Sequence, residues 1–530
     1  MQYLNTENAT IRQPLSKSVY DLAIVGSGIS CTYTLIHYIN LLKEKFNRQQ
    51  LPKEPIKVVI LDKYGEFWTG IPYGSRTGQQ SLIITALKEF LPQQERDRFI
   101  GWLNDNCDSV LDSLSARGGI LNRQWLKLYQ SAMVEGNWDE LFLPRYVFGW
   151  YLTEQVEQAI QQARSEGYLQ CDLVIAEVVN IQQVKGNYQV DFTVGDGDNS
   201  CIRTEKVVLA IGSPPNKATV DGFEKASANV CAIANMYEPS QNENIQRIAK
   251  FLSKSDTPDL NRVLIIGSNA SALETLYSLN NLPEAEDLIS KFIIVSPNAR
   301  FPHRIYNEPA STSYIPQNLK TLIRSKFTAE QIYEAVKKDV EAALKQNETV
   351  DGTYKVISKE VINALNMLDF DEQKMFVIKY GVEIGKYQRR AGQDYLNVVD
   401  RLILEDRLEF IKGKFSQTIP LSEGKLGFEY VTGDRQQLFT DSINIIINCA
   451  GFQDLTKSDS ILIKNLVERG ICTPNDSKCG FEMSGDFEVN KNFYLMGPLV
   501  AGNINDKLKI WHAESCGRII NLSRKLAEIL

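Results

Sequence analysis

Two segments of the chain repeat the same order of an apolar strand, a glycine-containing loop and a helix. The first is YDLAIVGSGISCTYTL, which starts at Tyr20, and the second is NRVLIIGSNASALETL, which starts at Asn261. In each, the loop and the N-terminus of the helix can hold a nucleotide phosphate. The chain is therefore predicted to be an α/β protein with two dinucleotide-binding, Rossmann-like domains.

The first loop, Gly26 to Cys31, fits the pattern G-x-G-x-x-small. Its first glycine allows a tight turn, its second lets a pyrophosphate approach the backbone, and its last position packs the helix on the strand. Asp62 ends the next predicted strand, 34 residues after Gly28, where its carboxylate can accept hydrogen bonds from a ribose. An adenine dinucleotide without a 2′-phosphate is predicted here. Cys31 is interpreted as a tolerated small residue and not as a redox thiol.

The second loop runs from Gly267 to Glu274 and reads G-x-N-x-S-A-x-E. Asn269 replaces the second glycine, and we expect it to hold a left-handed turn because asparagine tolerates positive φ better than most residues. Ser296 ends the following strand in place of an acid, and Arg300 lies four residues beyond. A hydroxyl and a guanidinium accept a 2′-phosphate that a carboxylate would repel, so NADPH is favoured over NADH.

Three later strands end in glycine: VVLAIGS at Gly212, IIINCAGF at Gly451 and YLMGPL at Gly497. We expect each to return a strand to the first nucleotide domain, where close approach of a cofactor to the backbone requires glycine. These positions predict a series of glycine contacts along an extended cofactor.

The same reading divides the chain into a discontinuous first domain, a second domain and a helical insertion. The segment TAEQIYEAVKKDVEAAL, with a capping box from Thr328 to Gln331, identifies the insertion as helical. The predicted bounds are 1–245 for the first part of the first nucleotide domain, 246–312 and about 406–430 for the second, NADPH-binding domain, 313–405 for the helical insertion, and 431–530 for the second part of the first nucleotide domain.

Composition excludes several other classes of protein. The net charge is −7 with no basic stripe, which argues against a nucleic-acid partner. No apolar run is long enough to span a membrane and no secretory signal is recognisable, so a cytoplasmic protein is predicted. Nine scattered cysteines, never spaced Cys-x-x-Cys, indicate reduced thiols, and three distant histidines predict no metal site.

The order of these motifs resembles the flavoproteins that bind two dinucleotides. The S-A-x-E loop together with NCAGF resembles the N-hydroxylating and related class B flavin monooxygenases. A closer likeness is to the bacterial FAD–NAD(P)-binding family of YdhS-type proteins. It rests on WTGIPYG, FLPQQERDRFIGWL, LPRYVFGWYL and VVLAIGSPPN, which start at Trp68, Phe90, Leu143 and Val207. Cys31, Asn269, Ser81 and Ile84 depart from the family pattern.

The resemblance implies that FAD and NADPH are the cofactors. It also implies a single-component monooxygenase that forms a C4a-(hydro)peroxyflavin and transfers one oxygen of O₂ to a small nitrogen-containing metabolite. Oxygen transfer requires no obligatory acid, base or nucleophile, so no catalytic residue is assigned. The predicted cofactor-binding residues are Gly26, Gly28, Ile29, Ser30, Asp62, Lys63, Gly70, Ile71, Val178, Ala210, Gly212, Gly451, Phe452 and Gly497 in the first set, and Gly267, Ser268, Asn269, Ala270, Ser271, Glu274, Ser296 and Arg300 in the second.

Two alternatives remain open at this point. One is an NADPH-dependent flavin reductase or oxidase without oxygen transfer, and the other is a non-catalytic FAD- or NADP-binding module that docks a partner through its helical segment. Substrate candidates are His303 and Arg304 after the second domain's strand, and Arg389 and Arg390 in KYQRRAG. A structural role is the better interpretation of His303, and a solvated helix face that of the two arginines. A carboxylate-bearing substrate would suit an arginine clamp.

Overall fold

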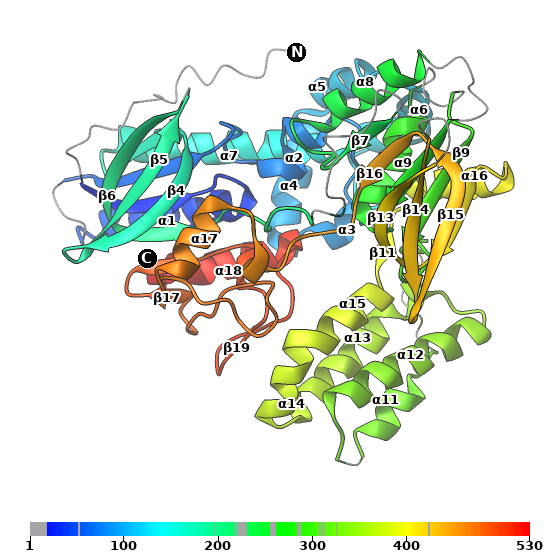
Figure 1. Ribbon diagram of the computed structural model, residues 1–530. Helices are drawn as coiled ribbons and strands as arrows, with labels where there is room; N and C mark the ends of the chain where they lie inside the picture. The colour runs from blue at the N-terminus through cyan, green and yellow to red at the C-terminus, as the bar shows by residue number, and fades with distance from the viewer. Residues whose placement is uncertain are drawn as a thin grey trace.

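The computed structural model describes residues 19–50, 54–195, 197–217, 219, 230–254, 261–282, 288–306, 309, 311, 313–324, 326–421 and 425–530. The predicted α/β class is confirmed, since two largely parallel sheets carry helices on their faces (Figure 1). Within the described residues, no helix is both long and apolar enough to cross a membrane.

The first sheet combines strands from both ends of the chain. Its order is β17-β18-β6-β1-β2-β3, and β4 and β5 extend it through β6. The strands are β1 (Val19–Val25), β2 (Ile56–Asp62), β3 (Leu169–Ile175), β4 (Glu177–Val184), β5 (Asn187–Val194), β6 (Asp198–Leu209), β17 (Glu488–Asn490) and β18 (Phe493–Leu495). β1 pairs in parallel with β2 and β6, and its last four residues are buried, as expected of a strand covered on both faces.

Helices from distant parts of the sequence cover this sheet. They are α1 (Ile29–Asn47), α7 (Arg145–Ser165), α17 (Ile461–Glu468) and α18 (Cys516–Ile529). α1 packs against both α7 and the C-terminal α18, and α17 packs on β4. The first domain is therefore discontinuous, as predicted.

The second sheet is parallel and has the order β12-β9-β8-β16-β7. Its strands are β7 (Cys231–Ile233), β8 (Arg262–Ile266), β9 (Lys291–Ser296), β12 (Leu408–Lys412) and β16 (Ile445–Asn448). A three-stranded antiparallel sheet packs on one face through Phe428; it consists of β13 (Lys414–Pro420), β14 (Leu426–Thr432) and β15 (Arg435–Ile443).

The other face of the second sheet carries helices that continue into the segment after β2. They are α8 (Gln241–Leu252), α9 (Ala270–Asn280) and α16 (Gln393–Leu404). The segment after β2 adds α2 (Gly70–Tyr73), η2 (Ser75–Thr77), α3 (Leu87–Phe90), α4 (Gln93–Asp105), α5 (Cys107–Ser115) and α6 (Ile120–Val134). One hydrophobic core joins Phe99 and Phe148 from this segment to Ile265 and Leu273 of the second domain. Residues 82–152 thus pack against both nucleotide domains and hold them together.

The helical insertion forms a separate bundle below the sheets in Figure 1. It comprises α11 (Gln317–Leu322), α12 (Ala329–Lys345), α13 (Val350–Met367), α14 (Phe370–Met375), the π-helical η5 (Phe376–Tyr380) and α15 (Gly381–Tyr387). The bundle has its own core, and the predicted capping box at Thr328 and Gln331 is present. The short parallel pair β10 (His303–Arg304) and β11 (Arg390–Ala391) joins it to the second domain.

The sheets place several elements differently from the predicted domain bounds. β7, β15 and β16 belong with the second domain, although 1–245 and 431–530 were assigned to the first. α16 packs on α9 and not on the helical bundle, so the bundle ends near Tyr387 and not at residue 405. A short, fully buried strand such as β16 fits either parallel sheet, and only its pairing with β8 and β7 fixes its place.

Candidate cofactor sites

The first loop turns at a position that admits no side chain. Gly26 has φ +93°, in the left-handed region that favours glycine. A Cβ at Gly26 would lie 2.5 Å from the carbonyl oxygen of Ala210. The Ala210 amide in turn donates to Val25 O at 2.8 Å, which holds the ends of β6 and β1 together. At the predicted residues Gly26 and Ala210, the backbones of the first loop and of the end of β6 therefore lie in close contact.

Three other predicted glycines converge on the start of α1. A Cβ on Gly70, which has φ +56°, would lie 3.0 Å from the Cα of Gly28. A Cβ on Gly497, which has φ +85°, would lie 2.6 Å from Oγ of Ser30, in the first turn of α1. This cradle of bare backbone at a helix N-terminus fits a pyrophosphate, because the N–H groups and the helix dipole favour an anion.

Asp62 is tied to the loop by hydrogen bonds. Its Oδ2 accepts from the amide of Ser27 at 3.2 Å and from the Ser27 hydroxyl at 2.7 Å, and its Oδ1 accepts from the Tyr64 amide at 2.9 Å. An ionised carboxylate offers roughly four acceptor positions, so capacity remains for a ribose hydroxyl. The arrangement fits the ribose role predicted for Asp62.

The other residues of the first set differ in their exposure and surroundings. Lys63 forms an ion pair with Glu177 at 2.9 Å, and both side chains are about half exposed. Val178 is buried in β4, and Ile71 is exposed on α2. Gly212, with φ +80°, has no atom within 4 Å of an added Cβ.

Gly212 and Gly451 mark the two points where the chain passes between the domains. Gly212 follows β6 of the first sheet, whereas Gly451 follows β16 of the second, so the expectation that both strands return to the first domain is wrong for Gly451. The two connections run side by side: Asn216 bridges Phe452, and the Lys217 amide donates to Gly451 O at 2.8 Å. The similar sequences at Gly212 and Gly451 thus belong to two paired connections between the domains.

The second loop repeats the backbone crossing of the first. Gly267 has φ +106°, and a Cβ there would overlap the carbonyl oxygen of Cys449 at the end of β16. Asn269 precedes α9 with φ −98° and ψ −165°, which is extended backbone. The left-handed conformation expected for Asn269 is therefore wrong, and an exposed side chain fits there without strain. Ala270 and Ser271 form the first turn of α9, as predicted.

Ser296, which ends the strand after the second loop, accepts a hydrogen bond from that loop as Asp62 does from the first loop. The Ser268 hydroxyl donates to Oγ of Ser296 at 2.9 Å, as Ser27 donates to Asp62 in the first loop. Arg300 lies nearby, with its guanidinium 4.8 Å from the ring centre of Tyr387. An acid thus accepts a hydrogen bond from the first loop, and a neutral hydroxyl accepts one from the second.

Glu274 joins the domains. Its side chain is 1% exposed, and its two carboxylate oxygens bind Arg145 of α7 and the hydroxyl of Tyr237. Arg145 also donates to Leu82 O at 2.9 Å. These protein partners engage the carboxylate that the sequence assigns to coenzyme binding, so Glu274 acts as an inter-domain anchor. The motif predicts an acid at this place, but not its partners.

The substrate candidates from the sequence separate into paired and unpaired side chains. Arg304 forms an ion pair with Asp400, and Arg390 forms ion pairs with Asp351 and Glu89. His303 is half-buried, and its Nε2 has no hydrogen-bond partner. Burial, with Arg518 and Arg389 adding to it, lowers the pKa of His512 to about 4, and His512 is a residue that the sequence reasoning missed. The dipeptide Trp511-His512 just before α18 was the available signal.

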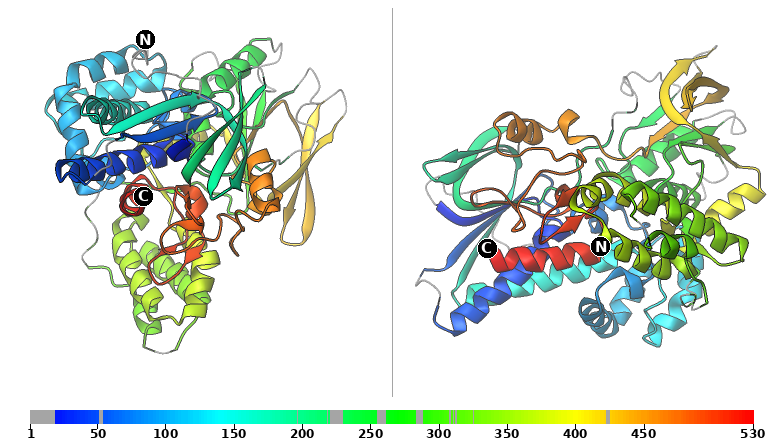
Figure 2. Two further views of the ribbon diagram at one scale, coloured as in Figure 1. Left: turned by 90° about the vertical axis from the view of Figure 1, so that its left-hand side faces the viewer. Right: turned by 90° about the horizontal axis from the view of Figure 1, so that it is seen from below.

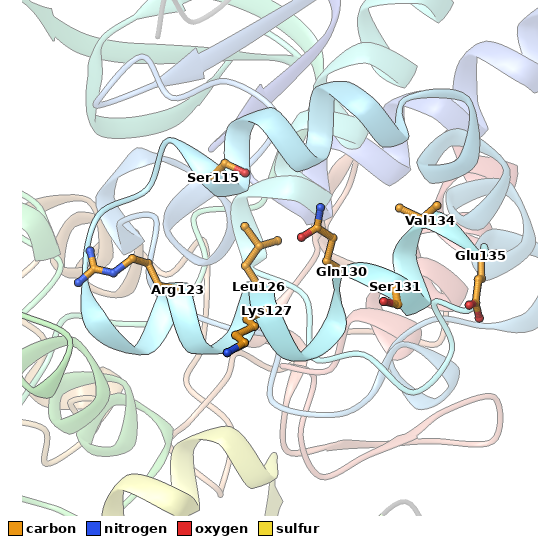
Figure 3. Close-up of a pocket in the computed structure, with 8 residues that line it drawn as sticks. All are labelled: Ser115, Arg123, Leu126, Lys127, Gln130, Ser131, Val134 and Glu135. Carbon is orange, nitrogen blue, oxygen red and sulfur yellow. The ribbon is translucent and has the colours of Figure 1, made fainter.

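Ser81 and Ile84, the departures from the family pattern, lie in the segment that fastens the domains. The Ser81 hydroxyl donates to Thr77 O at 3.1 Å, and Ile84 packs on the shared core. A surface pocket lies on α6, lined by residues that include Arg123 and Glu135 (Figure 3). None of its lining residues belongs to either glycine loop. Among the described residues, no cluster of His, Cys, Asp and Glu is placed to hold a metal ion.

The comparisons with known proteins agree with this geometry. Residues 23–214 match the family model described as FAD-NAD(P)-binding. Over 97% of its length, the chain is 27% identical to uncharacterized proteins of Mycobacterium tuberculosis and Mycobacterium bovis, covering 96% of each.

Two solved structures share the fold of the whole chain. One is the ornithine N-hydroxylase of Kutzneria sp. 744, at 13% identity and TM-score 0.50, covering 97% of this chain and 98% of that one. The other is the FAD-bound cadaverine monooxygenase of Erwinia amylovora, at 12% identity and TM-score 0.51, covering 96% and 94%. The chain therefore shares its overall fold with these two structures.

Cys31 packs in the core of the first domain. It is 0% exposed between α1 and the sheet, and burial raises the pKa of its thiol well above the ordinary value. The neutral thiol is a poor nucleophile. All nine cysteines are free, and Cys479 is exposed.

We predict that Cys31→Gly retains flavin, because the residue only fills a packing position. The expected cost is about 1–2 kcal/mol of unfolding free energy for the lost side chain. A thiol reagent should label Cys479 in the native protein and Cys31 only after unfolding, as measured by mass spectrometry of peptides. Loss of flavin from a folded Cys31→Gly protein would contradict this role.

Proposed function

We propose that the protein is a FAD-dependent, NADPH-reduced monooxygenase that oxygenates a small nitrogen-containing metabolite. The observation that carries this proposal is the pair of glycine loops with different strand-end residues, Asp62 in one and Ser296 in the other. Bound FAD supplies the redox chemistry and the activation of O₂, and the protein supplies binding, orientation and exclusion of water.

The residues of the first loop hold the FAD in this account. Gly26, Gly28, Gly70 and Gly497 leave backbone room for the pyrophosphate, and the first turn of α1 supplies N–H donors at Ile29 and Ser30. Asp62 accepts hydrogen bonds from the adenosine ribose.

The residues of the second loop hold the NADPH. The first turn of α9 faces the pyrophosphate, and Gly267 keeps the loop close to the end of β16. Ser296 and Arg300 receive the 2′-phosphate, because neither repels its negative charge and the guanidinium attracts it. The arginine also lies against Tyr387, whose ring limits its freedom.

The substrate class is supported by the shared fold. The Kutzneria protein is named as an ornithine N-hydroxylase and the Erwinia protein as a cadaverine monooxygenase, and each covers nearly the whole chain. Ornithine and cadaverine both carry a primary amine. We therefore propose a nitrogen nucleophile as the acceptor of oxygen.

Ser296→Asp is predicted to reverse the coenzyme preference. A carboxylate at this position would repel the 2′-phosphate and accept hydrogen bonds from an unmodified ribose, as Asp62 does in the first loop. The ratio of kcat/KM for NADPH over NADH should fall by about tenfold or more, since each 1.4 kcal/mol corresponds to a factor of ten. Anaerobic flavin reduction with each coenzyme measures the ratio, and an unchanged ratio in Ser296→Asp would exclude Ser296 from the phosphate site.

Oxygen transfer is tested by comparing NADPH oxidised with H₂O₂ released. The holoprotein is incubated with NADPH and O₂ alone, and then with each member of a panel of amines, amino acids and purines. A monooxygenase is expected to release less H₂O₂ than the NADPH it consumes when its substrate is present, with a product heavier by one oxygen. Equal amounts of H₂O₂ and oxidised NADPH across the whole panel would instead identify an oxidase.

A further inference from the structure

Arg117 is a buried cation with no counter-charge. It lies in the α5–α6 turn, residues 116–119, and is 6% exposed. Its Nη2 donates to Oε1 of Gln80 at 3.4 Å, and its guanidinium lies 5.0 Å from the ring centre of Tyr146, but its Nε has no hydrogen-bond partner. Among the residues that the structure describes, no carboxylate forms an ion pair with Arg117. Burial lowers its pKa, yet a guanidinium remains charged near pH 7.

A second buried N–H group without a partner lies at the same turn. Asn281, at the C-terminal end of α9, is 0% exposed, and its Nδ2 has no hydrogen-bond partner. Its Oδ1 accepts from the amide of Asn122 at 3.1 Å, and its carbonyl oxygen accepts from the amide of Ile120 at 3.1 Å. Gly119 has φ +103°, and a Cβ there would overlap the side-chain amide of Asn281. The turn and the first residues of α6 thus enclose the Asn281 side chain.

Gln80 and Asn122 connect these two groups. Oε1 of Gln80 accepts from both Arg117 and Asn122, and the backbone of Asn122 donates to Asn281. Nδ2 of Asn122 also donates to Gly118 O at 2.8 Å. An amide oxygen has two lone pairs, so Oε1 of Gln80 has none left. The cluster formed by Arg117, Gln80, Asn122 and Asn281 therefore keeps unused donors on Arg117 and Asn281 and lacks an acceptor for them.

The missing acceptor has to carry a negative charge. A buried charge costs a large free energy unless it is paired, and a buried polar group without a partner marks a place where an ion or water binds. A water molecule would satisfy Asn281 but would leave the charge of Arg117 unpaired. An anion satisfies both residues, because guanidinium and amide N–H groups both donate to it.

The cluster borders solvent on one side. The left-hand view of Figure 2 shows the light-blue helices of residues 93–134 at the edge of the molecule, apart from the yellow-green helical bundle. Ser115 and Arg123, which flank the α5–α6 turn, lie at one end of the surface pocket in Figure 3. Gly118, within the turn, is exposed, and a Cβ there would meet no atom within 4 Å. A small ion can thus approach the cluster from solvent at this turn.

We propose that Arg117 and Asn281 bind a small monovalent anion, chloride or a carboxylate as small as formate. The anion accepts from Nε of Arg117 and Nδ2 of Asn281 and neutralises the guanidinium. Asn281 ends a helix of the second domain, whereas Arg117 belongs to the segment that packs against both domains. The bound anion therefore strengthens the contact between this segment and the second domain. The proposal does not rest on the proposed function, because the site lies apart from both glycine loops.

The experiment is urea unfolding of the FAD-loaded protein at constant ionic strength and with a fixed excess of FAD. Sodium gluconate is replaced stepwise by sodium chloride or, separately, by sodium formate. Constant ionic strength keeps the screening of surface charges the same, so a change in stability reports binding. Once the site is saturated, each tenfold rise in at least one of the two small anions should increase the ratio of folded to unfolded protein about tenfold.

Two variants test the residues. Arg117→Met removes the cation and should abolish the dependence of stability on the anion. Gln80→Glu should abolish it too, because the new carboxylate lies where Gln80 already accepts from Arg117 and supplies the counter-charge within the protein. Gln80→Glu preserves the size of the side chain and decides the test if Arg117→Met does not fold.

Arg123→Met is the matched control, since Arg123 is exposed near the start of α6, and it should keep the anion dependence of the unmodified protein. Stability of the unmodified protein that responds to neither anion would overturn the proposal. An unchanged response in Gln80→Glu, or in folded Arg117→Met, would overturn it as well. The readout is unfolding and not activity, so failure of the proposed function would not alter it.

Discussion

Gly26→Ala is expected to lose FAD, whereas Gly267→Ala is expected to keep FAD and lose reduction by NADPH. Both glycines have positive φ, and each lies against a carbonyl oxygen of the adjacent strand, that of Ala210 or of Cys449. Alanine would be strained by roughly 1–3 kcal/mol at such a backbone angle, and overpacking adds a similar amount. The strain falls on the first loop in one variant and on the second loop in the other.

The readouts are the flavin content after purification and the rate of anaerobic flavin reduction by NADPH. Gly385→Ala is the control, because Gly385 lies in α15 with no atom within 4 Å of an added Cβ. It should keep both flavin and reduction. Loss of flavin from a folded Gly267→Ala protein, or full flavin content in Gly26→Ala, would contradict the assignment of the loops.

Arg145→Met should lower the free energy of unfolding by about 3–5 kcal/mol. The substitution leaves the Glu274 carboxylate, which is 1% exposed, without its cation in the interior between the domains. Breaking one side of a buried ion pair has this cost, whereas replacing both partners with apolar residues is often neutral. Denaturant unfolding monitored by tryptophan fluorescence measures the change.

Two variants complete this test. The double variant Arg145→Met/Glu274→Met should recover most of the lost stability. Lys63→Met, which removes an exposed ion pair with Glu177, should change stability by only about 0–1 kcal/mol. Equal destabilisation by the single and double variants would show that the buried pair is not the anchor.

The sequence predicted best those features whose cause is local. Glycines at positive φ, such as Gly26 and Gly267, are visible because few other residues adopt that conformation. The capping box at Thr328 is equally local, and the structure contains it. The strand-end contrast between Asp62 and Ser296 follows from the fixed geometry of a βα unit.

Features that depend on long-range packing could not be predicted in the same way. β16 is an apolar strand with no mark of which sheet it joins, so the boundary at 431–530 differs from the observed sheets. Glu274 lies in a recognised motif, but its partner Arg145 is 129 residues away.

The most direct test of the central claim is anaerobic mixing of the purified protein with NADPH, followed by stopped-flow absorbance. The two loops are predicted to hold FAD and NADPH together, so the protein should purify yellow and its flavin absorbance should bleach, faster with NADPH than with NADH. A colourless protein that takes up no added FAD, or a bound flavin that neither coenzyme reduces, would contradict the account.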